Sequence, residues 1–197
     1  REGTEWSKEH TFTISSAPEE GEMQISVQAA GPFTTALQSV AAGTEVRIRG
    51  PLGHFCKDAE QHPRVTFIAG GIGITPFLSV LRHWARVGTH THFVLLWANN
   101  TTTDIIHREE LNTIAEKLGA RIVHILWKDE DSVKACACEA PQTCRSGLLD
   151  AATLAENADL GNTDVYLCGP PQMHKMTKEI LHTLGVDPAR VHTEIMV

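Results

Sequence analysis

The sequence lacks the features that mark membrane, nucleic-acid-binding and secreted proteins. Its longest unbroken apolar run, FVLLWA at residues 93–98, is far too short to span a bilayer. The formal net charge is −7 and no basic cluster is present, so nucleic acid and anionic membrane surfaces are poor partners. The opening REGTEWSKEH does not read as a signal peptide. The five cysteines are odd in number and not spaced as a secreted disulfide framework, so we expect a reducing, cytoplasmic location.

The pattern of apolar and polar residues changes near residues 60–63, and this change predicts two domains, 1–62 and 63–197. The first half has two alternating, strand-like pieces, MQISVQA and TEVRIRG, with a short helical piece, FTTALQSV, between them. Gly and Pro residues interrupt this half at intervals, as in a small antiparallel barrel or sheet. The second half alternates five apolar strands with helices, which predicts a doubly wound parallel α/β sheet covered on both faces. Those strands are RVTFIAG, THFVLLWA, RIVHILW, DVYLCG and RVHTEIMV.

The junction IAGGIGITPFL, residues 68–78, joins the first of these strands to a helix through three glycines. Gly70, Gly71 and Gly73 allow a sharp turn and a close approach of the backbone to an anion. Thr75 is placed to cap the helix, and Pro76 suits its first turn. A pyrophosphate fits the free N–H groups at such a helix start. The spacing misses the usual GxGxxG fingerprint, so a plain tight turn stays open as the alternative.

A second stretch, DVYLCGPPQM at residues 164–173, delivers Cys168, Gly169 and Pro170 to the carboxyl end of another buried strand. Ligands of parallel sheets bind outside the carboxyl ends of strands, so this stretch is expected to face the same edge as the glycine junction. The alternative for Cys168 is a buried core thiol, a common fate of a free cysteine.

A third stretch, HTFTISSAP at residues 10–18, alternates a histidine, an aromatic ring and hydroxyls along one strand-like piece. Such a strand offers a phosphate partner, a ring surface and hydrogen bonds to a planar cofactor. The alternative is an ordinary edge strand with Ser and Thr on its wet face.

These stretches, together with GPFT at 31–34, GPLG at 50–53 and the terminal HTEIMV, resemble the ferredoxin–NADP reductase superfamily. The most similar branch is the flavin dehydrogenase portion of ferric reductases and NADPH oxidases. The resemblance covers essentially the whole chain. It implies a partial antiparallel flavin barrel followed by a five-stranded NAD(P)-binding domain. It also implies an oxidoreductase that passes a hydride from NADH or NADPH to FAD, then single electrons to a haem, iron–sulfur, ferric or oxygen acceptor.

The resemblance assigns roles by position in the motifs. The implied cofactor-binding residues are His10, Phe12, Thr13, Ile14, Ser15, Ser16, Gly31, Thr34, Gly70, Gly71, Gly73, Thr75, Pro76, Asn99, Asn100, Cys168, Gly169, Pro170 and Met173. Closest to the reacting atoms would be Cys168 at the nicotinamide, Glu194 at the flavin edge and Thr13 at the flavin. No acid–base dyad or nucleophile is required, because positioning donor against acceptor is most of the catalysis.

The chain departs from the family pattern at its two ends. Nine residues precede His10, far fewer than in relatives, so we expect a fragment of a longer chain or an incomplete barrel that holds FAD weakly. The branch implies a membrane haem domain upstream, which would place the chain on the cytosolic face of a membrane protein. His10 stands where many relatives have arginine, a stronger phosphate partner. Met196 stands near the position of the terminal aromatic that shields the flavin.

Asn99 and Asn100 follow the second strand of the α/β half, where NADP-specific relatives commonly have an arginine. Their amides offer hydrogen bonds and no positive charge, which favours NADH. The alternative is that another cation, such as Arg108, pairs with the 2′-phosphate.

CACEAPQTC, residues 136–144, has no place in the family pattern, and our leading interpretation is a surface insertion. Cys136, Cys138 and Cys144 are candidate ligands of zinc or an iron–sulfur cluster, but a fourth ligand is missing, so no metal site is assigned. A disulfide between two of the three is a further alternative. His90 and His92 have no evident third ligand, and we interpret them as solvated. Two other functions stay open: a nucleotide-binding regulatory module without flavin turnover, and a metal-sensing module built on the cysteine loop.

Overall fold

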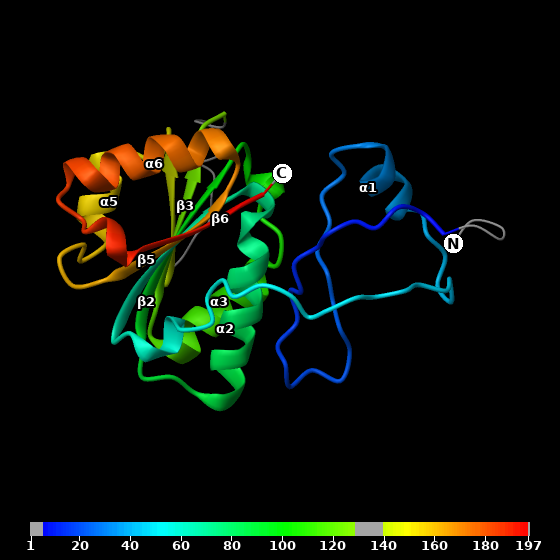
Figure 1. Ribbon diagram of the computed structural model, residues 1–197. Helices are drawn as coiled ribbons and strands as arrows, with labels where there is room; N and C mark the ends of the chain where they lie inside the picture. The colour runs from blue at the N-terminus through cyan, green and yellow to red at the C-terminus, as the bar shows by residue number, and fades with distance from the viewer. Residues whose placement is uncertain (1–5, 129–139, 197) are drawn as a thin grey trace.

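The computed structural model describes residues 6–128 and 140–196. One six-stranded sheet forms its centre, and every neighbouring pair of strands in it is parallel (Figure 1). The strand order is β4-β3-β2-β1-β5-β6. The strands are β1 Arg64–Gly70, β2 His92–Asn99, β3 Arg121–Leu126, β4 Gln142–Ser146, β5 Asp164–Gly169 and β6 Val191–Ile195. The predicted parallel α/β class is confirmed.

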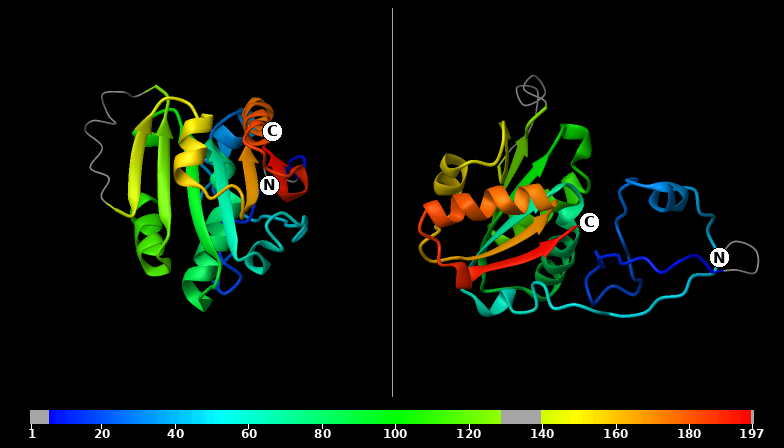
Figure 2. Two further views of the ribbon diagram at one scale, coloured as in Figure 1. Left: turned by 90° about the vertical axis from the view of Figure 1, so that its left-hand side faces the viewer. Right: turned by 45° about the horizontal axis from the view of Figure 1, so that its top comes forward.

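Helices cover both faces of this sheet, as expected for βαβ units (Figures 1 and 2). The helices on one face are α2 Thr75–Val87 and α3 Arg108–Leu118, and those on the other are α5 Ala151–Asn157 and α6 Pro171–Thr183. Short 3-10 turns are η1 Ala59–Gln61, η2 Gly71–Ile74, η3 Thr102–Asp104 and η4 Pro188–Arg190. Helix α3 ends at Gly119, whose φ of +63° suits glycine. In the described ranges no helix has the length and apolarity to cross a bilayer.

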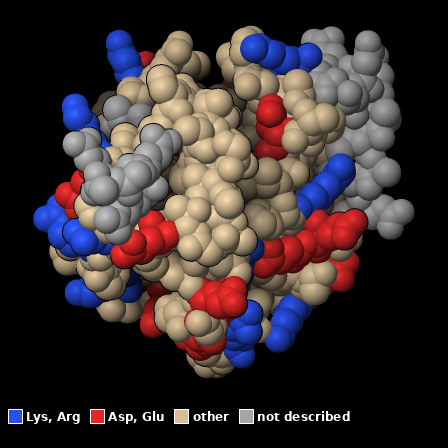
Figure 3. Space-filling view, turned by 90° about the vertical axis from the view of Figure 1, so that its right-hand side faces the viewer, with Lys and Arg blue, Asp and Glu red and all other residues tan. Residues whose placement is uncertain are grey.

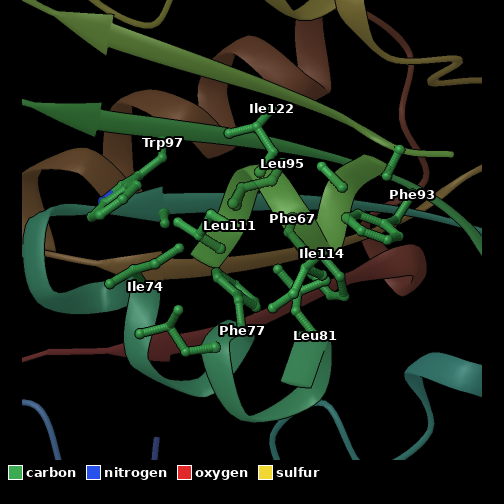
Figure 4. Packing of buried hydrophobic residues seen from close by; sticks show 14 of the residues in the cluster. Phe67, Ile74, Phe77, Leu81, Phe93, Leu95, Trp97, Leu111, Ile114 and Ile122 are labelled. Carbon is green, nitrogen blue, oxygen red and sulfur yellow. The ribbon is translucent and has the colours of Figure 1, made fainter. Parts of the chain in front are cut away.

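The core consists of two apolar clusters, one on each face, because side chains alternate along each strand. In β1, Phe67 packs toward α2 and Ile68 packs toward the opposite helices. Figure 4 shows Phe67 and Leu95 meeting Phe77 and Leu81 of α2. All five of these side chains have no exposed surface. Burial of each contributes roughly 1.5–3 kcal/mol, so the sheet and its helices form a rigid platform.

The sheet has six strands where the sequence predicted five. The additional strand is β4, which lies at the edge of the described sheet and pairs with β3. Its sequence, QTCRS, is short and polar, and we assigned it to the cysteine loop. An edge strand needs less apolar sequence than a central one, and here one buried polar contact anchors it: His124 Nε2 lies 2.7 Å from Gln142 Oε1.

Residues 6–63 contain no strand ladder, although we predicted strands in MQISVQA and TEVRIRG. Among the described residues before β1, the structure contains one isolated antiparallel bridge, Ile14–Ile25, and the short helix α1 Pro32–Leu37. An isolated pair of strands is marginal in water without further strands or a packed face. Val46, Ile48 and Leu52 are accordingly 65%, 66% and 77% exposed. The face that carries this segment shows a broad uncharged area bordered by charged side chains (Figure 3).

Candidate nucleotide-binding site

The glycine junction and the Cys-Gly-Pro stretch lie side by side at the point where the sheet reverses its winding. Strand β1 pairs with β2 on one side and with β5 on the other. Helix α2 leaves β1 toward one face, and α6 leaves β5 toward the other (Figure 1). The register pairs Ala69 with Cys168, so the two turns begin next to each other. Such a reversal opens a crevice at the carboxyl ends of the strands, where nucleotides bind in open α/β sheets.

Two of the three junction glycines are required by the contact between these turns. A Cβ on Gly73 would lie 2.3 Å from the carbonyl oxygen of Cys168. A Cβ on Gly70 would lie 2.4 Å from Met173 Sδ, and one on Gly169 would lie 3.1 Å from the amide nitrogen of Gly70. The sequence suggested that these glycines let an anion approach, and the structure adds that they let the two turns approach each other.

Gly71 differs from its neighbours. Its φ is +51°, in the left-handed region, and a Cβ there would meet nothing within 4 Å. The space beside Gly71 is therefore open, and its backbone conformation turns the chain into η2. This is the place in the junction where a ligand has room.

Thr75 does not cap α2 as predicted. The helix begins at Thr75 itself, and the Thr75 hydroxyl donates to the carbonyl of Ile72 at 3.1 Å. Its side chain is turned back into the 3-10 turn and buried. Pro76 lies in the first turn, as predicted. No side chain caps α2, but the Thr75 amide donates to the Ile72 carbonyl and Pro76 has no N–H. The first N–H groups that can meet an anion are therefore those at the start of η2, around Gly71.

Trp97, which we did not single out, fixes the glycine turn. The indole Nε1 donates to the carbonyl of Gly71 at 2.9 Å, and the ring is 1% exposed. Its position at the end of the second strand, directly before Ala98 and Asn99, was the available signal in the sequence.

Asn99 and Asn100 have different surroundings at the end of β2. Asn99 is 6% exposed, and its side-chain nitrogen is buried without a hydrogen-bond partner within the part of the chain that the structure describes. Asn100 is exposed, and its side-chain oxygen accepts a hydrogen bond from Trp127 Nε1 at 2.5 Å. A buried amide donor without a partner is costly, so Asn99 fits a group that accepts hydrogen bonds, such as a ribose hydroxyl.

Cys168 is fully buried beside Cys56 and Glu194. Burial, with the Glu194 carboxylate as a smaller cause, raises the pKa of the Cys168 thiol to about 12. Burial also raises the pKa of Glu194 above its ordinary value. Cys168 is therefore a neutral thiol at physiological pH, suited to packing and weak hydrogen bonding rather than to nucleophilic attack.

A pocket of about 430 Å³ lies on the α2 side of β5 and β6. Its lining comes from residues 54–58, Tyr166 and residues 192–194. Glu194 and Cys56 belong to this lining, so the pocket borders the buried thiol pair. Its size falls within the range of pockets for small molecules.

The residues of the proposed flavin motifs are only partly brought together. The His10 ring stacks on Phe33 with centroids 3.7 Å apart, and Phe12 lies 6.2 Å from the same ring. This joins HTFTISSAP to GPFT. Thr34 Oγ1 accepts from the Gly31 amide at 2.9 Å, which fixes the start of α1. Phe33 was missed, although it lies inside the quoted GPFT motif.

Ser15 and Ser16 are buried and make hydrogen bonds within the N-terminal segment. Ser15 Oγ donates to the Gln24 carbonyl at 3.3 Å, and Ser16 Oγ accepts from the Gln24 amide at 3.0 Å. Their hydroxyls join the two arms around the Ile14–Ile25 bridge. Thr13, which precedes the bridge, is partly exposed.

One side of α2 holds this segment against the α/β domain. Arg82 NH1 donates to the carbonyl of Ser15 at 2.7 Å, and Ser79 Oγ donates to the carbonyl of Ser16 at 2.7 Å. Arg82 is 6% exposed and also makes a two-pronged pair with Glu110, at 2.6 and 2.8 Å. The pair lowers the pKa of Glu110. The flavin-motif strand is thus tied to the helix that starts at the glycine junction.

The cysteine loop is only partly described. Cys144 is disulfide-bonded, while Cys136 and Cys138 lie outside the described residues. A sulfur in a disulfide is not a thiolate ligand. Cys56 and Cys168 are free thiols. His90 and His92 are exposed, in agreement with a solvated role.

Residues 67–179 match the family described as the oxidoreductase NAD-binding domain. The chain belongs to this family. Both turns lie within the matched residues. The fold is shared with a ferredoxin NADP+ reductase from Neisseria gonorrhoeae, with a TM-score of 0.67 and 17% identity. This agrees with the superfamily that the sequence motifs predicted.

Similar proteins include electron-transfer enzymes. The chain is 26% identical over 192 residues to the gamma subunit of sulfhydrogenase 2 of Pyrococcus furiosus, covering 93% of this chain and 65% of that protein. It is 30% identical over 164 residues to NADH-cytochrome b5 reductase 1 of Pyricularia oryzae, covering 81% and 51%. The FAD/NAD-binding domain of a Vibrio cholerae nitric oxide dioxygenase shares the fold, with a TM-score of 0.71, 20% identity and coverage of 99% and 80%. The chain spans about half to two thirds of these two curated relatives.

Proposed function

We propose that this chain carries a hydride from NAD(P)H to FAD and then passes single electrons to a haem, iron–sulfur, ferric or oxygen acceptor. The observation that supports it most is the pair of touching turns at the carboxyl ends of β1 and β5. There, two glycine turns touch, Gly71 faces open space, and α2 begins without a side-chain cap. The oxidoreductase family membership agrees with this chemistry.

The nucleotide would bind along the carboxyl edge of the sheet. The pyrophosphate would lie on the N–H groups at the start of η2, beside Gly71 and Gly73, and the adenosine ribose near Asn99. The buried, unpartnered amide of Asn99 supports this placement. We infer a preference for NADH, because Asn99 and Asn100 bring hydrogen bonds and no positive charge for a 2′-phosphate.

The residues 1–62 would contribute to flavin binding, and 63–197 would bind the nucleotide. FAD, when bound, supplies hydride acceptance and one-electron release. His10, Phe12 and Thr34 would hold it, and Cys168 and Glu194 would border the nicotinamide. The closeness of Cys168 and Glu194, and the stacking of His10 on Phe33, support these roles. A membrane haem domain as the electron acceptor stays a prediction.

A second candidate, a nucleotide-binding regulatory module without flavin turnover, is favoured by one observation. In residues 6–63 the antiparallel pairing is one bridge, and the hydroxyls of Ser15 and Ser16 are used within the segment. Such a module would bind NAD(P)H at the crevice and leave flavin unreduced.

An anaerobic flavin assay separates the two candidates. The purified chain is incubated with FAD, freed of excess flavin by gel filtration, and mixed with NADH or NADPH while the flavin absorption is followed. Bleaching that is faster with NADH supports the proposal, including the nucleotide preference. Tight NADH binding without bleaching, in protein that retains flavin, supports the regulatory module. Failure to bind either nucleotide would contradict both.

A further inference from the structure

Two histidines and an aspartate meet at the end of β5 and β6 that is opposite the nucleotide crevice. Asp164 is the first residue of β5, His192 lies near the start of β6, and His62 lies just before β1. The Asp164 carboxylate reaches both rings: Oδ2 lies 3.2 Å from His62 Nδ1, and Oδ1 lies 3.2 Å from His192 Nε2. One ligand atom from each residue lies within 4.8 Å of the other two.

This spacing is that of ligands around one metal ion. Zinc binds histidine nitrogen at about 2.0–2.1 Å and carboxylate oxygen at about 2.0–2.2 Å, so neighbouring tetrahedral ligand atoms are roughly 3.3–3.5 Å apart. The two measured separations are 3.2 Å each and involve different oxygens of the Asp164 carboxylate. One ion between the two rings would therefore be held by both oxygens, or by one oxygen after a small rotation of the carboxylate. Two imidazoles and one carboxylate are a donor set typical of zinc and related divalent transition metals. We propose that His62, Asp164 and His192 form a zinc-binding site, with a fourth position left for water.

The surroundings hold two of the three ligands in place. The His192 ring stacks on Tyr166, with centroids 4.4 Å apart and planes at 19°. Arg190 donates to Asp164 Oδ2 from Nε at 3.4 Å and from NH2 at 3.3 Å, and to the Gly161 carbonyl at 2.9 Å. Partners of this kind orient metal ligands. Arg190 also places a positive charge near the carboxylate, so its removal is expected to strengthen cation binding.

The site has a structural consequence for the neighbouring pocket. His62 follows η1 in the segment that connects residues 54–58 to β1, and His192 itself lines the 430 Å³ pocket. A metal bound by His62 and His192 would tie this connecting segment to β5 and β6. The ion would therefore fix one wall of the pocket.

Metal titration of the complete 197-residue chain tests the site. After treatment with a chelator, the protein is titrated with zinc in competition with a chromophoric chelator, and with cobalt(II) as a spectroscopic probe. We expect one equivalent of zinc to bind and to raise the melting temperature. His62→Ala, Asp164→Asn and His192→Ala should each weaken binding at least about tenfold, because each removes one of three ligands. Arg190→Gln should bind zinc at least as tightly as the unaltered chain.

His92→Ala is the matched control, because His92 is an exposed histidine of β2 outside the cluster. It should bind zinc like the unaltered chain. His62→Ala is the most informative variant, since His62 lies outside the strands and its loss should leave the sheet folded, as circular dichroism can verify. Unchanged zinc affinity in folded His62→Ala would overturn the proposal. So would absence of zinc binding, or cobalt absorption of the thiolate charge-transfer type, which would place the metal on cysteines. None of these readouts needs bound flavin or nucleotide, so the site is tested independently of the proposed function.

Discussion

The indole Nε1 of Trp97 donates a 2.9 Å hydrogen bond to the carbonyl oxygen of Gly71. This bond joins the end of β2 to the turn that follows β1, at the carboxyl edge of the sheet. Gly71 has a positive φ and no side chain, and the space beside it is open. Gly71 itself therefore makes no packing contact that holds the turn in place. The tryptophan supplies that restraint from the neighbouring strand.

Replacing Trp97 by Phe should weaken NADH binding without unfolding the domain. The change keeps an aromatic ring and removes the donor to Gly71, which costs about 1 kcal/mol, or roughly a fivefold rise in Kd. Isothermal titration with NADH measures the effect. Trp84→Phe is the control, since Trp84 is equally buried but packs against Phe67 and Phe93 away from the turn. Equal effects of the two changes on Kd would show that the bond to Gly71 has no part in binding.

Gly73→Ala should destabilise the chain and weaken nucleotide binding together. The new methyl would lie 2.3 Å from the Cys168 carbonyl oxygen, so the two turns must move apart. Overpacking of this kind costs about 1–3 kcal/mol. Urea unfolding and NADH titration give the two effects. Gly161→Ala, where the nearest atom would be 3.9 Å away, should change the free energy of unfolding by less than about 0.5 kcal/mol. Gly73→Ala with unchanged stability would contradict the close contact of the turns.

Arg82→Met should release the flavin-motif segment from α2. The change keeps much of the apolar stem and removes the donors to Ser15 and Glu110. We expect the free energy of unfolding to fall by about 2 kcal/mol. Solvent weakens the ion pair, because Glu110 is partly exposed, and the expected loss takes this into account. Hydrogen exchange of the Ser15 amide, which donates to Gln24 at 2.8 Å, should become faster. Arg64→Met is the control, because Arg64 is exposed and its 3.0 Å contact is with Asp159, outside the flavin-motif segment. If hydrogen exchange at the Ser15 amide is unchanged in Arg82→Met, the contacts of Arg82 do not hold this segment on α2.

Because His124 is buried in its neutral form, we expect the free energy of unfolding to fall in mild acid. Burial lowers the pKa of the folded His124 ring to about 4. The unfolded ring titrates near its ordinary value of about 6.5, so between these values the unfolded chain binds the extra proton. Stability from neutral His124 is therefore fully present above about pH 6.5 and lost as the pH falls toward 4. The loss from pH 7 to pH 5 is about 2 kcal/mol.

His124→Gln removes this titration and keeps a side-chain donor near Gln142. The free energy of unfolding, measured by urea at pH 7 and pH 5, should differ less between the two pH values in this variant than in the unaltered chain. His92→Gln, at an exposed histidine, should leave the pH dependence nearly unchanged. If His124→Gln keeps the full pH dependence, the acid sensitivity comes from other groups.

The elements of the α/β half could mostly be predicted from the sequence, because the spacing of apolar residues there agrees with the positions of Gly and Pro. RVTFIAG and DVYLCG are buried strands, and Gly119 ends α3 as a C-terminal glycine does. β4 was missed because its five residues are mostly polar, and it depends on the His124–Gln142 contact, which joins residues 18 apart. A tertiary contact of this kind leaves no local pattern.

The sequence predicted that the two turns share one edge of the sheet, but not that they touch. Gly70, Gly73 and Cys168 could be named from their turns, whereas the reason for the glycines, direct contact between two turns, needs the register of β1 and β5. The hydroxyl of Thr75 had two possible uses at a helix start, and the 3-10 turn before it decides which one occurs. In the first half, alternation predicted strands, but a strand forms only where a neighbour can pair with it.

The most direct measurement is an NMR titration of the amide groups of the chain with NADH. We expect the largest shifts at residues 71–75 and at Gly169, Gln172 and Met173, in the two touching turns, together with the side-chain amide of Asn99. Shifts of comparable size should follow with ADP-ribose, which carries the same pyrophosphate. Shifts confined to other parts of the sheet, or none at saturating NADH, would contradict nucleotide binding at the crevice between β1 and β5.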